Sequence, residues 1–74
     1  MQQVYLVKGV PVYVRHLPSG DMVVWHPFNE AVRVVVEPIC QGNGYWQPEY
    51  KNWIIWKSRA YRILNELAKA GEKR

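Results

Sequence analysis

The spacing of apolar residues changes at Asn29 from the two-residue period of a strand to the period of a helix. Before Asn29, alternate positions of residues 10–15 are valine, as in a strand with one buried face. After it, apolar residues recur three and four positions apart, as on one side of a helix: Val32, Val35, Val36, Ile39 and Cys40. A chain of 74 residues with both patterns is predicted to form one small domain, residues 1–74, of mixed strands and helices.

Three strands are predicted before the helix. Residues 4–7 and 10–15 are rich in β-branched and aromatic side chains, and Gly9 between them either separates two strands or bends one. Residues 17–21, Leu-Pro-Ser-Gly-Asp, have the composition of a turn, because proline presets φ and glycine tolerates a positive φ. The turn leads into a third strand at residues 22–25, so we expect a hairpin here.

The first helix is expected to begin after Asn29, a residue type that caps helices, and to end near Cys40. Glu30 in the first turn suits the positive end of the helix dipole. A strand is the alternative, because residues 34–36 are all valine and Pro38 removes a helical hydrogen bond. Residues 41–44, Gln-Gly-Asn-Gly, then end the element.

The second half of the chain predicts another hairpin and a second helix. Strands at 45–47 and 52–56 flank a turn at 48–51, and Ser58 is expected to cap a helix that ends at Gly71. Arg62 and Glu66 are spaced to pair on that helix, and residues 71–74 are expected to fray. The apolar stripe of this helix consists of Ala60, Ile63, Leu64, Leu67 and Ala68.

The predicted order is β-β-β-α-β-β-α, an α+β domain with a small, mostly antiparallel sheet and two helices on one face. The other face of the sheet stays open. We expect Trp53, which alternates with Ile54 along its strand, to lie in the core. The side chains expected on the open face are Tyr5, Tyr13, Arg15, Trp25 and one of Trp46 and Trp56.

The net charge of +4 resides entirely in the second half of the chain. Up to Gly44, three basic residues balance three acidic ones, whereas seven basic residues outnumber three acidic ones after it. A basic region of this kind is typical of proteins that bind polyanions such as nucleic acids, but a solvated surface without a partner has the same composition. Charge alone does not separate these interpretations.

Aromatic and basic residues are interleaved in this basic half. Bases stack on exposed rings while lysine and arginine contact phosphates, so the combination favours nucleic-acid binding. The candidates for stacking are Trp46, Tyr50 and Trp56, with Tyr45 a weaker one. The candidates for phosphate contacts are Lys51, Lys57, Arg59 and Arg62, of which the last two share one helix face.

Residues 46–53, Trp-Gln-Pro-Glu-Tyr-Lys-Asn-Trp, resemble the motif of HARP (HepA-related protein) domains of annealing helicases. The helix led by Phe28 and the segment Ile-Leu-Asn-Glu-Leu at 63–67 resemble the family in the same order, so the likeness spans about residues 23–68. It implies a small α+β module that binds single-stranded or junction-like DNA and has no motor of its own. Tyr45 stands where the family has an arginine, so no phosphate contact is implied at that position.

The sequence offers little for catalysis or metal binding. Cys40 is the only cysteine, which excludes an internal disulfide, and it lies on the apolar helix stripe. His16 and His26 have no recognised ligand spacing to it, and the acidic residues of the first half are scattered. We expect no enzyme activity, no cofactor and no metal. The lone cysteine favours a reducing, cytoplasmic location, and we expect neither a signal peptide nor a membrane partner.

The expected function is a non-enzymatic module that binds single-stranded or structured DNA through a basic and aromatic surface. These residues do not distinguish DNA from RNA as the ligand. The alternative is a protein-interaction or self-assembly module that buries the same rings against another chain or a second copy, because tryptophan, tyrosine and arginine are also common anchors of protein interfaces.

Overall fold

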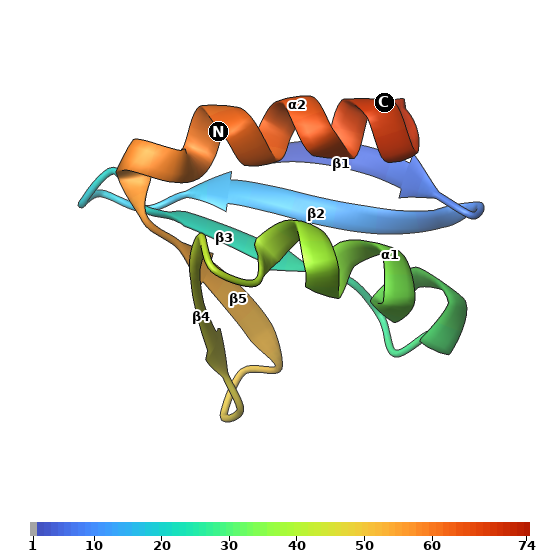
Figure 1. Cartoon of the computed structure of the whole chain (residues 1–74), viewed down its shortest axis with the longest axis horizontal. Coiled ribbons are helices and arrows are strands. Elements are labelled where there is room, and N and C mark those ends of the chain that lie inside the picture. The colour runs from blue at the N-terminus through green and yellow to red at the C-terminus, as the bar shows by residue number, and fades with distance from the viewer. Residues whose placement is uncertain (1) are drawn as a thin grey trace.

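A computed structural model describes residues 2–74, and Figure 1 shows how its elements are arranged. All strands join one antiparallel sheet in the order β4-β5-β3-β2-β1-β6, with both helices on one side. This is the predicted α+β architecture and element order, with one further strand at the end. The elements are β1 (Gln2–Val7), β2 (Val10–His16), β3 (Met22–Trp25), α1 (Glu30–Cys40), β4 (Gly44–Gln47), β5 (Asn52–Ile55), the 3₁₀ turn η1 (Lys57–Arg59), α2 (Ala60–Ala70) and β6 (Glu72–Lys73).

Strands β1 and β2 are joined by a two-residue turn at Lys8 and Gly9. Both residues have a positive φ, 54° and 77° respectively, as the tight type I′ turn of such a hairpin requires. The turn fixes the register, which places Tyr5 directly opposite Val12. Facing residues of paired strands share one face of the sheet, so Tyr5 lies beneath the helices and is only 2% exposed. The expectation that Tyr5 faces the open side was wrong.

Helix α1 begins and ends where the sequence predicts. The Asn29 side-chain Oδ1 accepts a hydrogen bond from the Val32 backbone N at 3.1 Å, which caps the helix. The helix continues past Pro38 to Cys40. The strand alternative is therefore excluded, and the spacing of the apolar stripe outweighs the β-branched run, because Val32, Val36 and Cys40 are all fully buried against the sheet.

The core lies between the helices and one face of the sheet. Helix α2 contributes Ile63 and Leu67, which are fully buried together with the α1 stripe. The sheet contributes the valines of its middle strands. Trp53 of β5, which was expected in the core, packs against the same cluster but is only half-buried. Burial of such side chains stabilises the fold by about 1.5–3 kcal/mol each. Helix α2 thereby packs over β1 and β6, at the end of the sheet farthest from β4, and neither helix covers the β4 edge.

Helix α2 begins later than predicted. Residues 57–59 form the 3₁₀ turn η1, and Arg59 occupies the N-cap without a side-chain hydrogen bond, so Ser58 does not cap the helix. The Lys57 backbone N donates to Asp21 Oδ1 at 2.9 Å and ties this segment to the β2–β3 turn, a long-range contact that the local sequence does not reveal. On α2, the carboxylate of Glu66 pairs with Lys69 at 3.9 Å and not with Arg62, so the predicted pair does not form.

The last residues form a strand instead of fraying. Residues 72–73 are β6, which pairs with β1, and the Arg74 backbone N donates to the Val4 carbonyl oxygen at 2.7 Å. A Cβ at Gly71 would lie 2.0 Å from the Leu6 carbonyl oxygen, so only glycine allows the chain to approach β1 this closely. Strand β6 is held by backbone hydrogen bonds and not by packing of its side chains. Its sequence therefore lacks the apolar and β-branched residues from which a strand could be predicted.

The face of the sheet opposite the helices is open over the described residues 2–74. Tyr13 lies opposite Trp25 on this face, and Arg15 lies opposite Val23 in the neighbouring row, as predicted for Tyr13, Arg15 and Trp25. The Trp56 backbone N donates to the Asn43 carbonyl oxygen at 3.1 Å, so the chain continues the β5 alternation to Trp56. The sequence did not decide which of Trp46 and Trp56 lies on the open face. Trp56 lies on the open face, and Trp46 lies on the helix side.

Candidate functional site

The β4–β5 hairpin projects beyond the helices (Figure 1). Residues of this hairpin, of the end of β3 and of α1 line a cleft on the helix side. Its volume is about 450 Å³, comparable to small-molecule sites of about 300–1,000 Å³. The cleft exists because α1 covers the middle strands and leaves the outer part of this face uncovered. Its lining residues are Val24, Trp25, His26, Phe28, Asn29, Arg33, Glu37, Trp46, Lys51 and Trp53.

Two tryptophans of the hairpin line the sheet side of the cleft. Trp46 of β4 lies directly opposite Trp53 of β5, and their ring centroids are 5.5 Å apart at an interplanar angle of 64°. Such an edge-to-face pair is a favoured arrangement of aromatic rings. Trp53 is fixed by its packing on the core, while 46% of Trp46 stays exposed. The pair therefore gives the cleft a preformed aromatic surface on which a planar ring can pack.

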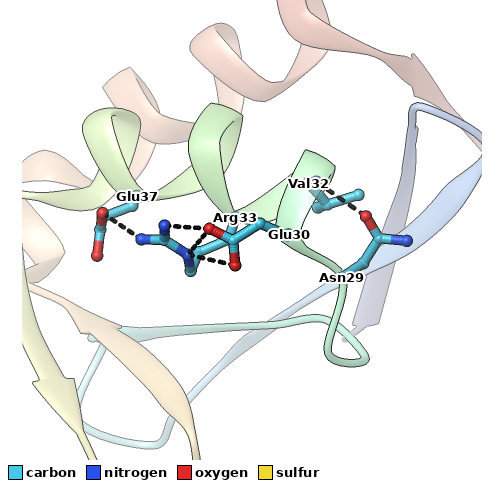
Figure 2. A network of polar contacts seen from close by, with 5 residues as sticks. All are labelled: Asn29, Glu30, Val32, Arg33 and Glu37. Atoms are coloured by element: carbon cyan, nitrogen blue, oxygen red, sulfur yellow. Dashed lines mark hydrogen bonds and ion pairs between the residues drawn. The ribbon is translucent and has the colours of Figure 1, made fainter.

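The wall on α1 is a network of charged side chains. Figure 2 shows the Arg33 guanidinium between the carboxylates of Glu30 and Glu37. Arg33 Nη1 donates to Glu37 Oε1 at 2.8 Å, and Arg33 Nε donates to the Glu30 carboxylate at 3.1 Å. The hydrogen bond from Arg33 lowers the pKa of Glu30, and the same bond raises the pKa of Arg33. Two carboxylates face one guanidinium, so this wall is net negative and Arg33 is already engaged.

Phe28 borders the cleft and is 90% exposed. It immediately precedes the N-cap Asn29, a position at which an apolar residue often packs against the fourth residue of the helix. In this chain the fourth residue of α1 is Arg33, so that apolar contact does not form. The sequence analysis treated Phe28 only as the start of a helix. A phenylalanine before the N-cap with no apolar residue at the fourth helical position is a signal that could have identified Phe28 as an exposed candidate site residue.

Lys51 brings a positive charge to the cleft from the tip of the β4–β5 hairpin. Its φ is 52°, a left-handed conformation uncommon for a residue with a side chain. It lines the cleft together with Trp46, so the structure joins two of the predicted site residues. Tyr50 lies beside Lys51 in the same turn and is 67% exposed, as expected.

The remaining predicted site residues lie away from the cleft. Trp56 is on the opposite side of the sheet from Trp46, so these two rings do not form one stacking surface. Lys57 and Arg59 lie in η1, beyond the other end of β5 from Lys51. Arg62 borders a shallow hollow between α1 and α2, together with Glu66. The predicted cations thus occupy separate places along the hairpin and α2.

Cys40, His16 and His26 are the remaining candidates for catalysis or metal binding. Burial raises the pKa of the Cys40 thiol to about 12, so the thiol is protonated and shielded at neutral pH. His26 is half-buried, with Nδ1 2.8 Å from the Pro27 carbonyl oxygen. Across residues 2–74, no cluster of three or more histidine, cysteine, aspartate and glutamate side chains is arranged to hold a metal ion.

Neither helix in residues 2–74 has both the length and the apolar character that crossing a membrane requires.

Comparisons of the chain with protein-family models, with curated proteins and with solved structures give no match. The cleft and the sheet must therefore be interpreted from their own chemistry.

Proposed function

We propose that this domain is a non-enzymatic module that binds single-stranded or structured DNA and takes up an unstacked base in the cleft beside α1. The observation that carries the proposal is the aromatic lining of this cleft, where the Trp46–Trp53 pair and the exposed Phe28 border one hollow. Every base has a π face, and stacking on a protein ring contributes about 1–3 kcal/mol per base.

The charges around the cleft favour a neutral ring inside and a phosphate at one end. The network on α1 is net negative and repels a phosphate, although its Glu37 carboxylate can accept a hydrogen bond from a base amino group. Lys51 at the hairpin tip offers the opposite charge. A nucleotide would therefore bind with its base over the indoles and its phosphate toward Lys51. The likeness of residues 46–53 to the HARP motif agrees with DNA as the ligand.

The other predicted cations extend this proposal along the molecule. Lys57, Arg59 and Arg62 lie beyond the base of the hairpin. Lys57 follows Lys51 by six largely extended residues, or roughly 20 Å. A strand held at the cleft would have to run along β5 to reach them. They would then contribute salt-dependent phosphate contacts without reading the base.

Phe28→Ala tests the cleft without disturbing the fold. Because the ring is almost fully exposed, its loss is expected to leave the free energy of unfolding within about 0.5 kcal/mol. The affinity for a fluorescently labelled oligothymidine of about 12 nucleotides is expected to fall about tenfold, as measured by anisotropy. The matched control is Tyr61→Ala, which removes an exposed ring from α2, away from the cleft. Equal affinities of Phe28→Ala and the wild type would remove the cleft from the proposal.

Lys51→Asn and Lys8→Asn form a matched pair. Both lysines have left-handed backbones in hairpin turns, with φ of 52° and 54°, and asparagine tolerates that conformation. Both changes remove one positive charge, but only Lys51 lines the cleft. Lys51→Asn is expected to weaken oligothymidine binding and to reduce the slope of log affinity against log salt by about 0.7, whereas Lys8→Asn should do neither. If the wild-type protein binds no oligonucleotide at low salt, the proposed function is wrong as a whole.

A further inference from the structure

Two adjacent rows of side chains cross the open face of the sheet. In the first row, Tyr13 lies opposite Trp25, and their ring centroids are 5.5 Å apart at an interplanar angle of 38°. In the second row, the register places Tyr45, Ile54, Val23 and Arg15 side by side across β4, β5, β3 and β2. The face therefore presents aromatic rings from three different strands on one surface.

The apolar residues between these rings are shielded, although no helix covers them in the described chain. Val23 and Ile54 are 8% and 5% exposed, yet both stand outside the core cluster on the other side of the sheet. Larger neighbours on the same face surround them, while Trp25 and Tyr45 remain 38% and 49% exposed. The result is a shallow apolar surface with rings raised at its edges.

The spacing of the rings fits an extended strand of nucleotides. Trp25 and Tyr45 lie on β3 and β4, which are separated by β5, so two strand spacings of about 4.8 Å place them about 10 Å apart across the sheet. Tyr45 is level with Val23, two residues from Trp25, which adds about 7 Å along the strands and gives a separation of about 12 Å. Rings at this separation can each receive a different base of one strand, as on the stacking platforms of single-strand-binding sheets.

The polar groups of this face complement a nucleic acid. Arg15 is the one charged residue that β2 to β5 contribute to the two rows on the open face. No carboxylate of residues 2–74 lies in these rows. Gln47 and Asn52 face each other on the same side and carry amide groups that can pair with base edges. Asn52 Oδ1 is buried without a hydrogen-bond donor in residues 2–74. An unpaired buried acceptor is destabilising, and a rotation of the amide would let a base amino group supply the missing donor.

We propose that the open face is a second binding surface for single-stranded DNA, on which one base stacks at Trp25 and Tyr13 and another at Tyr45. Arg15 contacts the backbone phosphates, and the Asn52 amide contacts a base edge. This inference rests on the proposed function, because it assigns a further surface to the same class of ligand. Trp25 also lines the cleft, so one DNA strand can pass from the open face to the cleft around the end of β3.

Three variants test the open face apart from the cleft. Tyr45→Leu is expected to weaken oligothymidine binding about tenfold, and its control Tyr61→Leu, on α2, should have no effect. Arg15→Gln should reduce the salt slope of binding by about 0.7, whereas Lys69→Gln, which removes the same charge from α2, should not. Asn52→Val is expected to raise the thermal midpoint because it removes an unpaired buried acceptor, and at the same time to weaken binding to a mixed-sequence oligonucleotide.

The outcomes separate this inference from the proposed function. If Phe28→Ala and Lys51→Asn weaken binding while Tyr45→Leu, Arg15→Gln and Asn52→Val bind as the wild type does, the cleft alone binds DNA and the open-face proposal is overturned. If Tyr45→Leu instead shifts a concentration-dependent monomer–dimer equilibrium, with unchanged affinity for DNA, a second copy covers the face and the proposal is also overturned. Circular dichroism and thermal unfolding establish that each variant is folded.

Discussion

The two faces of the sheet are built by the same strands but from different kinds of side chain. Beneath the helices, β2 and β3 present Val12, Val14 and Val24, which are completely buried. On the open side, the same two strands present Tyr13 and Trp25, and a large part of the Trp25 ring reaches solvent. A β-branched side chain of moderate volume suits close packing against a helix, whereas a large ring can pack on its neighbours in the plane of the sheet.

The difference shows that burial and core membership are separate properties in a domain of this size. Ile54 and Ile55 are consecutive residues of β5, and both are almost inaccessible to solvent. Only Ile55 belongs to the cluster beneath the helices. Ile54 is shielded from the side by neighbouring residues, and its burial therefore depends on rings that themselves remain accessible to a partner.

The largest contrast between the faces is expected in thiol labelling. Cys40 lies beneath the helices, and burial raises its pKa to about 12, so a disulfide reagent at pH 8 should reach it only when the protein opens. A domain stable by about 4 kcal/mol would show labelling about a thousandfold slower than a free thiol. Tyr45→Cys in a Cys40→Ala background should label at nearly the rate of an unfolded chain. Fast labelling of Cys40 in the native protein would show that the helix layer is open.

The raised pKa of Cys40 also predicts how the free energy of unfolding changes with pH. The unfolded chain loses the thiol proton at a lower pH than the folded protein does, so the free energy of unfolding should fall as the pH rises from about 9 toward 12. Cys40→Ala should remove this part of the pH dependence.

Alanine substitution of the two isoleucines is the next largest test. Ile55→Ala leaves a cavity beneath the helices and is expected to lower the free energy of unfolding by about 3 kcal/mol. Ile54→Ala is expected to cost about 1 kcal/mol, because water and the neighbouring rings can occupy the vacated space on the open face. Urea unfolding of the two variants gives both values. Equal losses would contradict an open face and would indicate that another layer, such as a second copy, covers it in solution.

The smallest effect is expected from acidification, which acts on the surface of the helix layer. Arg33 lowers the pKa of Glu30, so the stabilisation from their pairing is present above the ordinary pKa of glutamate and is lost as the pH falls through the lowered value. The network is exposed, so the decrease in thermal midpoint between pH 7 and pH 3 should be small. The matched variant Glu30→Gln should show a weaker decrease, and an equal decrease would assign the pH dependence to other carboxylates.

Most of the fold follows from local patterns in the sequence. The alternation of valines, the Asn29 cap and the stripe of α1 each act over a few residues, and each prediction is confirmed. Two errors are local, because Ser58 does not cap α2 and Glu66 does not pair with Arg62. The other errors concern contacts between distant segments. The side of the sheet taken by Tyr5 depends on the register that the Lys8–Gly9 turn imposes, and β6 depends on room beside β1 at Gly71.

The candidate site was less accessible to sequence reasoning than the fold. The pairing of Trp46 with Trp53 follows from the length of the hairpin turn, but their relation to α1 does not, because it depends on where the helix packs across the sheet. Phe28, Arg33 and Glu37 were read only as parts of a helix. The sequence grouped Trp46 with Trp56 because both are near each other along the chain, although strand alternation and the hairpin pairing place them on opposite sides.

The position of β6 affects where a strand from another molecule could be added to the sheet. Pairing with β6 partly occupies the outer edge of β1, so β4 forms the opposite edge with its outward backbone groups available. Exposed edges of this kind are templates on which further strands add during aggregation. Strand β4 has only four residues and is followed at once by Pro48, which has no backbone N–H to donate. This brevity limits intermolecular strand addition at the edge that also carries Trp46.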